Sequence, residues 1–363
     1  MKKILFISGA RPNLIKLAPL YKYFKNKKKF KVKILHTNQH SNKHLFKNIC
    51  SDLNIGVPNF IIDKIKSNTN INMISYFINK ISEVLDQFNP NYVILFGDVD
   101  TTLSGAIAAV KKNFPIFHIE AGLRSKDFRM QEEINRRLVD RISDLNFCTT
   151  LESLQNLKNE NQNTKSHHVG NIIFDNYFDL KNKINESKIL KKLSVKKDDY
   201  ILFTAHRYQI INSKLNLKKL CALINKFSTY YKVVFVCHSR TKMNLKKNKL
   251  LNTFDKNVIL TNPLNYTDFT KLLIFSKIVV TDSGGVHEEA YFHKKKCLIL
   301  RDQIEREEFL NQSLIKKINF VNAELKLKRI LKVKKYRLRL KNKWDGRVSQ
   351  RIFKIIENYV NNN

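Results

Sequence analysis

Glycine, proline and tryptophan are scarce in this chain of 363 residues, which contains nine Gly, six Pro and one Trp. This composition excludes collagen-like repeats and Gly/Pro-rich disordered sequences. Long apolar runs are missing as well, because none approaches the ~18 residues that a membrane span needs. We therefore predict a protein with no membrane partner.

Cysteine is also rare, and the five thiols are odd in number, widely spaced and mostly inside apolar runs. They are Cys50, Cys148, Cys221, Cys237 and Cys297. This pattern is typical of buried free thiols in a reducing compartment. The start, M-K-K-I-L-F-I-S, reaches a charged, helix-forming stretch without the long apolar core and cleavage site of a signal peptide. We predict a cytoplasmic protein.

Acidic residues are few, since 67 Lys and Arg face 31 Asp and Glu and give a formal net charge of +36. Such an excess first suggests nucleic acid. The lysines are nevertheless spread over the whole chain, and Asn and Ile are abundant too, as a codon bias toward A and T would produce. No nucleic-acid partner is predicted, and a nucleic-acid-binding module is the most remote alternative.

Apolar runs are plentiful but short, and they alternate with amphipathic stretches. The length suits two domains. Ten runs rich in Ile, Val, Leu and Phe are typical of buried parallel strands. They are 3–8, 31–37, 92–97, 115–120 and 144–149, followed by 200–206, 232–238, 257–261, 277–282 and 297–301. This alternation predicts the α/β class, with two successive Rossmann-like doubly wound domains.

The predicted boundaries give domains at 1–175 and 176–345 and an amphipathic closing segment at 346–363, which we expect to pack back toward the first domain. Polar residues follow seven of the predicted strands, in both halves. Because ligands bind beyond the carboxyl ends of such strands, these polar ends predict a cleft between the domains.

The stretch T-D-S-G-G-V-H-E-E (281–289) suggests a serine nucleophile, a metal site or a phosphate cradle. The first glycine of a G-x-S-x-G elbow is absent, and Tyr291 stands where a zinc-binding H-E-x-x-H helix needs its second His. Two glycines between a strand and a helix start favour an anion. The cradle is therefore preferred, with a tight turn that binds nothing as the alternative, and no metal site is predicted.

Carboxylates follow the strands of the first half, and Glu120 ends a wholly apolar strand. A charge there is costly unless it is paired or functional. Arg124 and Arg136 are candidate partners for a structural salt bridge, whereas carboxylates clustered around a substrate suggest general acid–base chemistry. In the second half, His206 ends a strand beside Arg207. His238 is interpreted as structural or peripheral.

Several longer stretches carry a resemblance that runs in order over nearly the whole chain. They are G-A-R-P-N-L-I-K-L-A-P-L (9–20), F-G-D-V-D-T-T-L-S-G-A-I-A-A (96–109), H-I-E-A-G-L-R-S-K-D-F-R-M-Q-E-E-I-N-R-R-L-V-D (118–140), A-H-R (205–207), V-T-D-S-G-G-V-H-E-E-A (280–290) and W-D-G-R-V-S-Q-R-I (344–352). The chain resembles the non-hydrolysing UDP-N-acetylglucosamine 2-epimerases. This resemblance implies the GT-B fold, a UDP-sugar substrate, an isomerase without a cofactor, and a homodimer.

The resemblance also implies a role for each matching residue. Residues at catalytic and sugar-binding positions are Asp98, Glu120, Glu132, Arg136 and His206. Residues implied in binding the UDP-sugar are Arg11, Lys16, Arg207, Leu264, Phe269, Ser283, Gly284, Gly285, Glu289 and Arg306. Gln39 and His40 match the allosteric segment of bacterial members. His287, in contrast, is expected on the helix surface.

The matching segments depart from the family pattern at a few positions. Asn13 replaces a common Glu, and Gln131 stands where Pro is usual. No departure removes a catalytic carboxylate. The alternatives are an epimerase of UDP-2,3-diacetamido uronic acids, a hydrolysing UDP-GlcNAc 2-epimerase and, more distantly, a GT-B glycosyltransferase.

Overall fold

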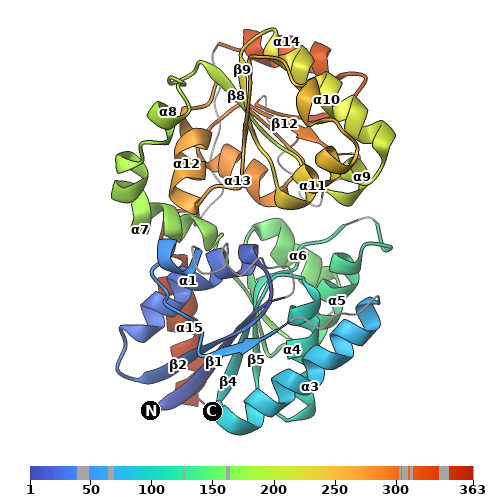
Figure 1. Cartoon of the computed structure of the whole chain (residues 1–363). Coiled ribbons are helices and arrows are strands. Elements are labelled where there is room, and N and C mark those ends of the chain that lie inside the picture. Colours follow the sequence, from blue (N-terminus) through green and yellow to red (C-terminus); the bar gives the residue numbers. More distant parts are fainter. Residues whose placement is uncertain are drawn as a thin grey trace. The chain divides into compact units, whose positions relative to one another are not determined.

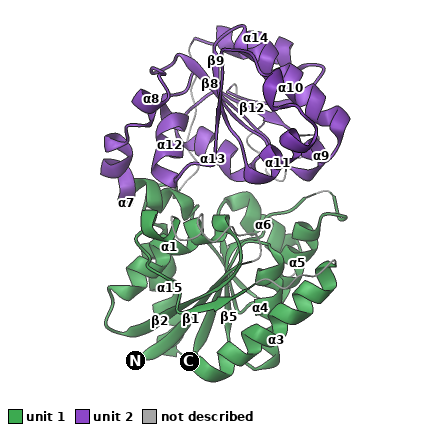
Figure 2. Cartoon of the chain, viewed as in Figure 1, with its two compact units in different colours: residues 1–179, 341–363 green, residues 180–340 purple. Residues whose placement is uncertain are grey.

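The computed structural model describes residues 1–38, 49–63, 69–125, 127–160, 164–301, 304, 310, 314–334 and 343–362. The chain forms two compact units (Figures 1 and 2). Unit 1 comprises Met1–Asp179 and Lys341–Asn363, and unit 2 comprises Leu180–Leu340. Both termini therefore belong to unit 1.

The described part of unit 1 contains a parallel sheet with the order β3-β2-β1-β4-β5-β6-β7. Its strands are β1 (Lys2–Ser8), β2 (Phe30–Thr37), β3 (Phe60–Ile62), β4 (Tyr92–Phe96), β5 (Ile116–Ala121), β6 (Leu145–Cys148) and β7 (Lys165–His168). Its helices are α1 (Arg11–Lys25), α3 (Asn70–Phe88), α4 (Asp100–Lys111), α5 (Gln131–Ile142), α6 (Leu151–Asn159), α7 (Ile173–Glu186), which continues into unit 2, and α15 (Val348–Asn362). The strand order reverses between β1 and β4, which is where doubly wound sheets bind ligands.

Helix α15 returns the end of the chain to the first unit. The centroid of the Phe353 ring lies 4.9 Å from that of the Phe24 ring and 5.7 Å from that of the Phe30 ring. Burying one such ring contributes roughly 1.5–3 kcal/mol. The carboxylate of Asp175 accepts the backbone N–H groups of Val348 and Ser349 at 3.2 and 2.7 Å. These bonds satisfy donors that a helix start leaves without intrahelical partners.

The described part of unit 2 contains a parallel sheet with the order β10-β9-β8-β11-β12-β13. Its strands are β8 (Tyr200–Thr204), β9 (Lys232–Val236), β10 (Val258–Thr261), β11 (Ile278–Thr281), β12 (Cys297–Leu300) and β13 (Ile315–Ile318). Its helices are α8 (Ile189–Lys192), α9 (Tyr208–Ile211), α10 (Lys214–Ser228), α11 (Ser239–Lys247), η1 (Leu251–Thr253), α12 (Tyr266–Phe275), α13 (Gly284–Phe292) and α14 (Ala323–Lys332). Here the order reverses between β8 and β11.

The predicted α/β class with two doubly wound sheets is confirmed, and each of the ten predicted strands is present within a few residues. Sequence reasoning missed β3, β7 and β13, which are short and lie at or near sheet edges. The stretch K-S-H-H of β7 has no apolar pattern of its own, and its pairing with β6 supplies the order that the sequence does not indicate. Among the described helices, none combines the length and apolar character that crossing a membrane requires.

Candidate functional site

Glu120 lies near the carboxyl end of β5 and is 6% exposed. Its side chain forms an ion pair with Lys16 of α1. Gly97, which follows β4, has a φ of +67°, and a Cβ there would lie 3.1 Å from Asn13 Nδ2 and 3.2 Å from Lys16 Nζ. Glycine adopts this backbone conformation without strain, and a Cβ here would crowd both side chains. Strand β4, strand β5 and helix α1 therefore bring a carboxylate and an ammonium group together.

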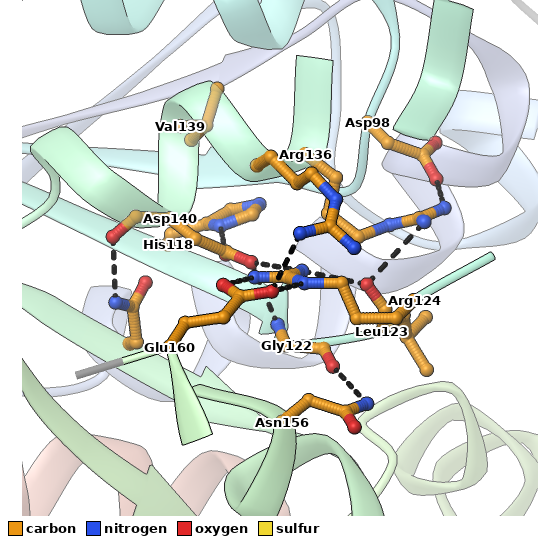
Figure 3. Close-up of polar contacts among 12 residues, drawn as sticks. Asp98, His118, Gly122, Leu123, Arg124, Arg136, Val139, Asp140, Asn156 and Glu160 are labelled. Atoms are coloured by element: carbon orange, nitrogen blue, oxygen red, sulfur yellow. Dashed lines mark hydrogen bonds and ion pairs between the residues drawn. The ribbon is translucent and has the colours of Figure 1, made fainter. Parts of the chain in front are cut away.

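Asp98 follows Gly97 and forms an ion pair with Arg136 of α5. Arg136 is 3% exposed and also donates from Nη1 to Glu133 at 2.6 Å. Asn135 donates to the backbone carbonyl of Asp98 at 3.0 Å. Helix α5 thus fixes both the side chain and the backbone of Asp98, as Figure 3 shows for the Arg136 contact.

The adjacent glutamates at the start of α5 differ in their surroundings. Glu133 is fully buried and accepts the backbone N–H of Ser125 at 2.8 Å and the Nε–H of Arg137 at 2.7 Å, in addition to Arg136. Glu132 is half-buried, and its carboxylate has no hydrogen bond or ion pair with the described residues. Glu133 therefore holds Arg136, while Glu132 remains available for a ligand.

Asn13, the departure from the family pattern noted above, connects α1 to β4. Its side-chain oxygen accepts the Ala10 N–H at 3.0 Å, and its Nδ2 donates to the carbonyl of Phe96 at 2.7 Å. A glutamate at this position has no donor for that carbonyl. Arg11, at the first position of α1, is exposed.

Of the two arginines considered as partners for Glu120, Arg124 pairs with Asp140 and Glu160. The interpretation of Arg124 as a Glu120 partner is therefore wrong. Lys16, which does pair with Glu120, was not foreseen as its partner, because the two residues are 104 positions apart in the sequence.

In unit 2, His206 follows β8, and its Nδ1 lies 2.9 Å from Oδ1 of Asp282. The second carboxylate oxygen accepts the backbone N–H groups of His206 and Arg207 at 2.7 and 2.8 Å. Burial raises the pKa of the Asp282 carboxyl, but the bonds from His206 and Arg207 outweigh this and hold that pKa below its usual value. Sequence reasoning gave no role to Asp282, although an acid at the end of an apolar strand was the available signal.

The S-G-G turn follows Asp282. Ser283 precedes the first turn of α13, and Gly284 and Gly285 begin the helix. A Cβ on Gly285 would meet nothing within 4 Å. Packing of the described residues therefore does not require glycine there. The Ser283 N–H is donated to Thr281 Oγ1 at 3.0 Å, and the N–H groups of a helix start generally favour an anion.

One expectation about this segment is wrong. His287, expected on the helix surface, is fully buried. Because α13 begins at Gly284, Glu288 and Glu289 lie in its second turn, where they are 0% and 9% exposed. His238 precedes α11, where its Nδ1 accepts the Arg240 N–H at 3.3 Å, and its ring lies 5.8 Å from that of His206.

The remaining predicted residues are placed as follows. Leu264 precedes α12 and Phe269 lies on it, both half-buried. Gln39, His40 and Arg306 lie outside the described residues. Across the described ranges, no group of three or more His, Cys, Asp or Glu side chains is arranged to hold a metal ion.

Comparison with known proteins places this arrangement in a family. The family model described as UDP-N-acetylglucosamine 2-epimerase matches residues 22–357. The chain belongs to this family. The resemblance seen in the sequence is thereby confirmed.

Several relatives of this epimerase-family chain are known. A Methanococcus maripaludis protein named "UDP-N-acetylglucosamine 2-epimerase homolog" is 38% identical over 84% of this chain and 85% of its own. A Pseudomonas aeruginosa protein named UDP-2,3-diacetamido-2,3-dideoxy-D-glucuronate 2-epimerase is 35% identical over 84% of each chain. The crystal structure of Methanocaldococcus jannaschii UDP-GlcNAc 2-epimerase in complex with UDP-GlcNAc and UDP matches with a TM-score of 0.88 and 32% identity, over 98% of this chain and 99% of that one.

Proposed function

We propose that this protein is a non-hydrolysing UDP-GlcNAc 2-epimerase, an isomerase that interconverts UDP-GlcNAc and UDP-ManNAc for surface polysaccharide synthesis. The observation that carries this proposal is the full-length similarity to an epimerase whose structure contains UDP-GlcNAc. The carboxylates that follow β4 and β5 support it, because inversion at a carbon needs acid–base groups around the sugar. No cofactor is needed for the reaction proposed below.

The chemistry divides into an elimination and a re-addition. A carboxylate removes the proton from C2, the C1–O bond breaks, and UDP leaves with the electron pair, so that a glycal-like intermediate forms. A second carboxylate then delivers a proton to the opposite face of C2 as UDP adds back to C1. We assign this work to Asp98, Glu120 and Glu132, with Arg136 holding Asp98 and Lys16 facing both Glu120 and the sugar.

The leaving diphosphate needs a fixed positive environment, since charge develops on it as the C1–O bond breaks. We assign this role to Arg11 in unit 1 and, in unit 2, to His206, Arg207 and the N–H groups of the S-G-G turn. We assign the ribose to Glu289, the uracil to Leu264 and Phe269, and a further ligand contact to Arg306. Catalysis in the first domain and nucleotide binding in the second stay a prediction, as do the domain boundaries and the regulatory role of Gln39 and His40.

Proton NMR in heavy water tests the proposed function. Purified protein incubated with UDP-GlcNAc should produce UDP-ManNAc with deuterium at C2. If neither the product nor deuterium incorporation is detected, the proposal is wrong. Release of ManNAc and UDP would identify a hydrolysing enzyme, and turnover that depends on an added acceptor would identify a glycosyltransferase.

The second candidate is epimerisation of a UDP-2,3-diacetamido uronic acid. The Pseudomonas aeruginosa relative named for that activity favours it, because its identity to this chain is close to that of the UDP-GlcNAc relatives. Comparing kcat/KM for the two UDP-sugars decides between them. We also propose a homodimer, which sedimentation analysis tests, and a cytoplasmic location, which the five buried free cysteines support.

A further inference from the structure

Glu120 has an unusual backbone conformation. Its φ is +72°, a left-handed value that is unfavourable for a residue with a Cβ. The pairing of β5 with β6 shifts register between Ile119 and Ala121, so Glu120 occupies a bulge. Such a conformation persists only where the surrounding structure holds it.

One buried carboxylate binds on both sides of this bulge. Asp140 of α5 is fully buried, and its Oδ1 lies 2.7 Å from Nδ1 of His118, two residues before Glu120. Its Oδ2 accepts the backbone N–H of Gly122, two residues after Glu120, at 3.1 Å. Figure 3 shows both contacts. Gly122 is packed so closely against Ser153 that a Cβ there would lie 2.2 Å from the Ser153 carbonyl oxygen. The carbonyl of Gly122 accepts a hydrogen bond from Asn156 at 2.9 Å. Both contacts restrict movement of Gly122.

His118 also reaches the backbone that carries Asp98. Its Nε2 lies 2.8 Å from the carbonyl oxygen of Gly97, the residue before Asp98. Both ring nitrogens of His118 therefore face oxygens that accept hydrogen bonds, an arrangement in which a doubly protonated ring satisfies both. Arg124 supports the carboxylate from the other side, donating to Asp140 at 2.7 Å.

We propose that His118 and Asp140 are positioning residues of the epimerase, and that their buried ion pair sets the bulge that carries Glu120 and the peptide that carries Asp98. This inference rests on the proposed function. Neither residue is placed against substrate; each acts through the carboxylate that it positions. A displacement of catalytic groups by about 1 Å can lower a rate ~10²-fold, so loss of the pair should lower kcat.

The variants Asp140→Asn and His118→Gln test the proposal. Each keeps a polar side chain of similar size and removes the ion pair. Per folded molecule, kcat should fall about 10- to 100-fold, while KM and the Kd for UDP stay within about threefold, because the proposed UDP contacts are untouched. Circular dichroism measures the folded fraction, and if Asp140→Asn does not fold, His118→Gln alone decides.

The matched control is Glu160→Gln. Glu160 accepts from the Arg124 guanidinium at 2.6 and 2.7 Å and from Arg137 at 2.8 Å, in the same network, and these three bonds do not involve residues 119–121. This variant should keep kcat within about threefold of the unchanged protein. An equal fall in kcat in the control would overturn the proposal, because the effect would then run through Arg124. So would an unchanged kcat in both folded test variants.

A second readout does not depend on activity. In protein labelled with ¹⁵N-histidine, the unchanged chain should show two ring N–H groups for His118 at pH 7, assigned by their loss in His118→Gln. In Asp140→Asn, His118 should no longer show both ring N–H groups, because the carboxylate that faces Nδ1 is gone. A single ring N–H in the unchanged protein would contradict the ion pair. Failure of the proposed function appears separately, as absence of C2 deuteration by the unchanged protein.

Discussion

A histidine–aspartate pair lies at the carboxyl edge of each sheet, and the two pairs differ in the use of the second ring nitrogen. In unit 1, His118 is fully buried and its Nε2 bonds to a backbone carbonyl. In unit 2, the side chain of His206 is 38% exposed, and none of the described residues accepts a hydrogen bond from its Nε2 or donates one to it. The histidine ring is therefore bonded through both nitrogens in unit 1, whereas in unit 2 it is partly exposed and pairs with its aspartate through Nδ1 alone.

The charges near the two pairs differ as well. The strand ends of unit 1 carry Asp98 and Glu120, whereas those of unit 2 carry His206, Arg207, the helix start of the S-G-G turn and one fully buried carboxylate, Asp282. This division predicts that substitutions of the unit 1 carboxylates change turnover and that substitutions of the unit 2 groups change nucleotide affinity. The six strands of the second sheet follow the same order as the first six of the seven in the first sheet, so the residues after each strand determine the difference.

Removing the Glu120 carboxylate should have the largest effect. Glu120→Gln should lower kcat by about 10²- to 10⁴-fold, the usual contribution of an acid–base group, with little change in UDP affinity. NMR rates and calorimetric titration with UDP measure the two quantities. The control is Asp86→Asn, which removes an exposed carboxylate of unit 1. A loss of UDP affinity as large as the loss of kcat would contradict the assignment of turnover to the unit 1 carboxylates and of nucleotide affinity to unit 2.

Substituting His118 and His206 in turn tests the comparison through the free energy of unfolding. His118→Ala leaves the fully buried Asp140 without one of its partners and should lower the free energy of unfolding by about 3 kcal/mol. His206→Ala should lower it by less, because the His206 side chain is 38% exposed and the buried Asp282 keeps the two backbone N–H bonds from residues 206 and 207. Urea unfolding followed by circular dichroism measures both units, and the fluorescence of Trp344, which is the only tryptophan, is 3% exposed and lies in unit 1, reports that unit alone. Equal shifts in the two variants would contradict the comparison.

The sequence predicted the strands and the positions of the site carboxylates, because apolar runs and the polar residues after them are local features. It did not predict what holds Glu120. The bulge, the positive φ and the contact with Lys16 arise from packing between distant segments. A weak signal existed for the ion pair of unit 1, since His118 is a polar residue inside the run I-F-H-I-E. Asp140 lies one turn after Arg136 on the same helix face, but only the folded helix brings it to His118.

Each unit also contains a buried histidine that should make it sensitive to acid. Burial lowers the pKa of His36 in unit 1 from 6.5 to about 4, although a hydrogen bond to Ser8 acts in the opposite direction. Burial, with a smaller effect of Lys295, lowers the pKa of His293 in unit 2 to about 4 as well. The unfolded chain takes up these protons near pH 6.5, before the folded chain can. The contribution of these two histidines to the free energy of unfolding is therefore fully present above pH 6.5 and is lost as the pH falls toward 4.

The loss should reach at most about 3 kcal/mol for each histidine. Urea unfolding at pH 7 and pH 4.5, followed by Trp344 fluorescence, measures it for unit 1. His36→Gln should reduce this pH dependence, whereas His293→Gln should leave the Trp344 transition unchanged. A reduced pH dependence of that transition in His293→Gln would mean that the two units do not unfold independently.

Arg207→Ala tests nucleotide binding by unit 2. The loss of a charge-assisted contact with the diphosphate should weaken UDP binding by about 1.5–3 kcal/mol, or roughly 10- to 100-fold. Calorimetric titration measures the Kd. Arg329→Ala, which removes an exposed arginine of α14, is the control for the loss of one positive charge. If both variants weaken binding equally, the effect reflects the overall basic charge and not a contact.

Two glycines give the smallest effects and separate a backbone requirement from a ligand requirement. Gly97 has a positive φ and close neighbours, so Gly97→Ala should destabilise unit 1 by about 1–2 kcal/mol. A methyl group on Gly285 would meet open space at the start of α13, so Gly285→Ala should leave stability unchanged or raise it by up to about 1 kcal/mol. The same methyl group should weaken UDP binding several-fold, because it occupies the space that we assign to the diphosphate. If Gly285→Ala binds UDP normally, the S-G-G turn is only a helix start, and the nucleotide contacts of unit 2 must be sought elsewhere.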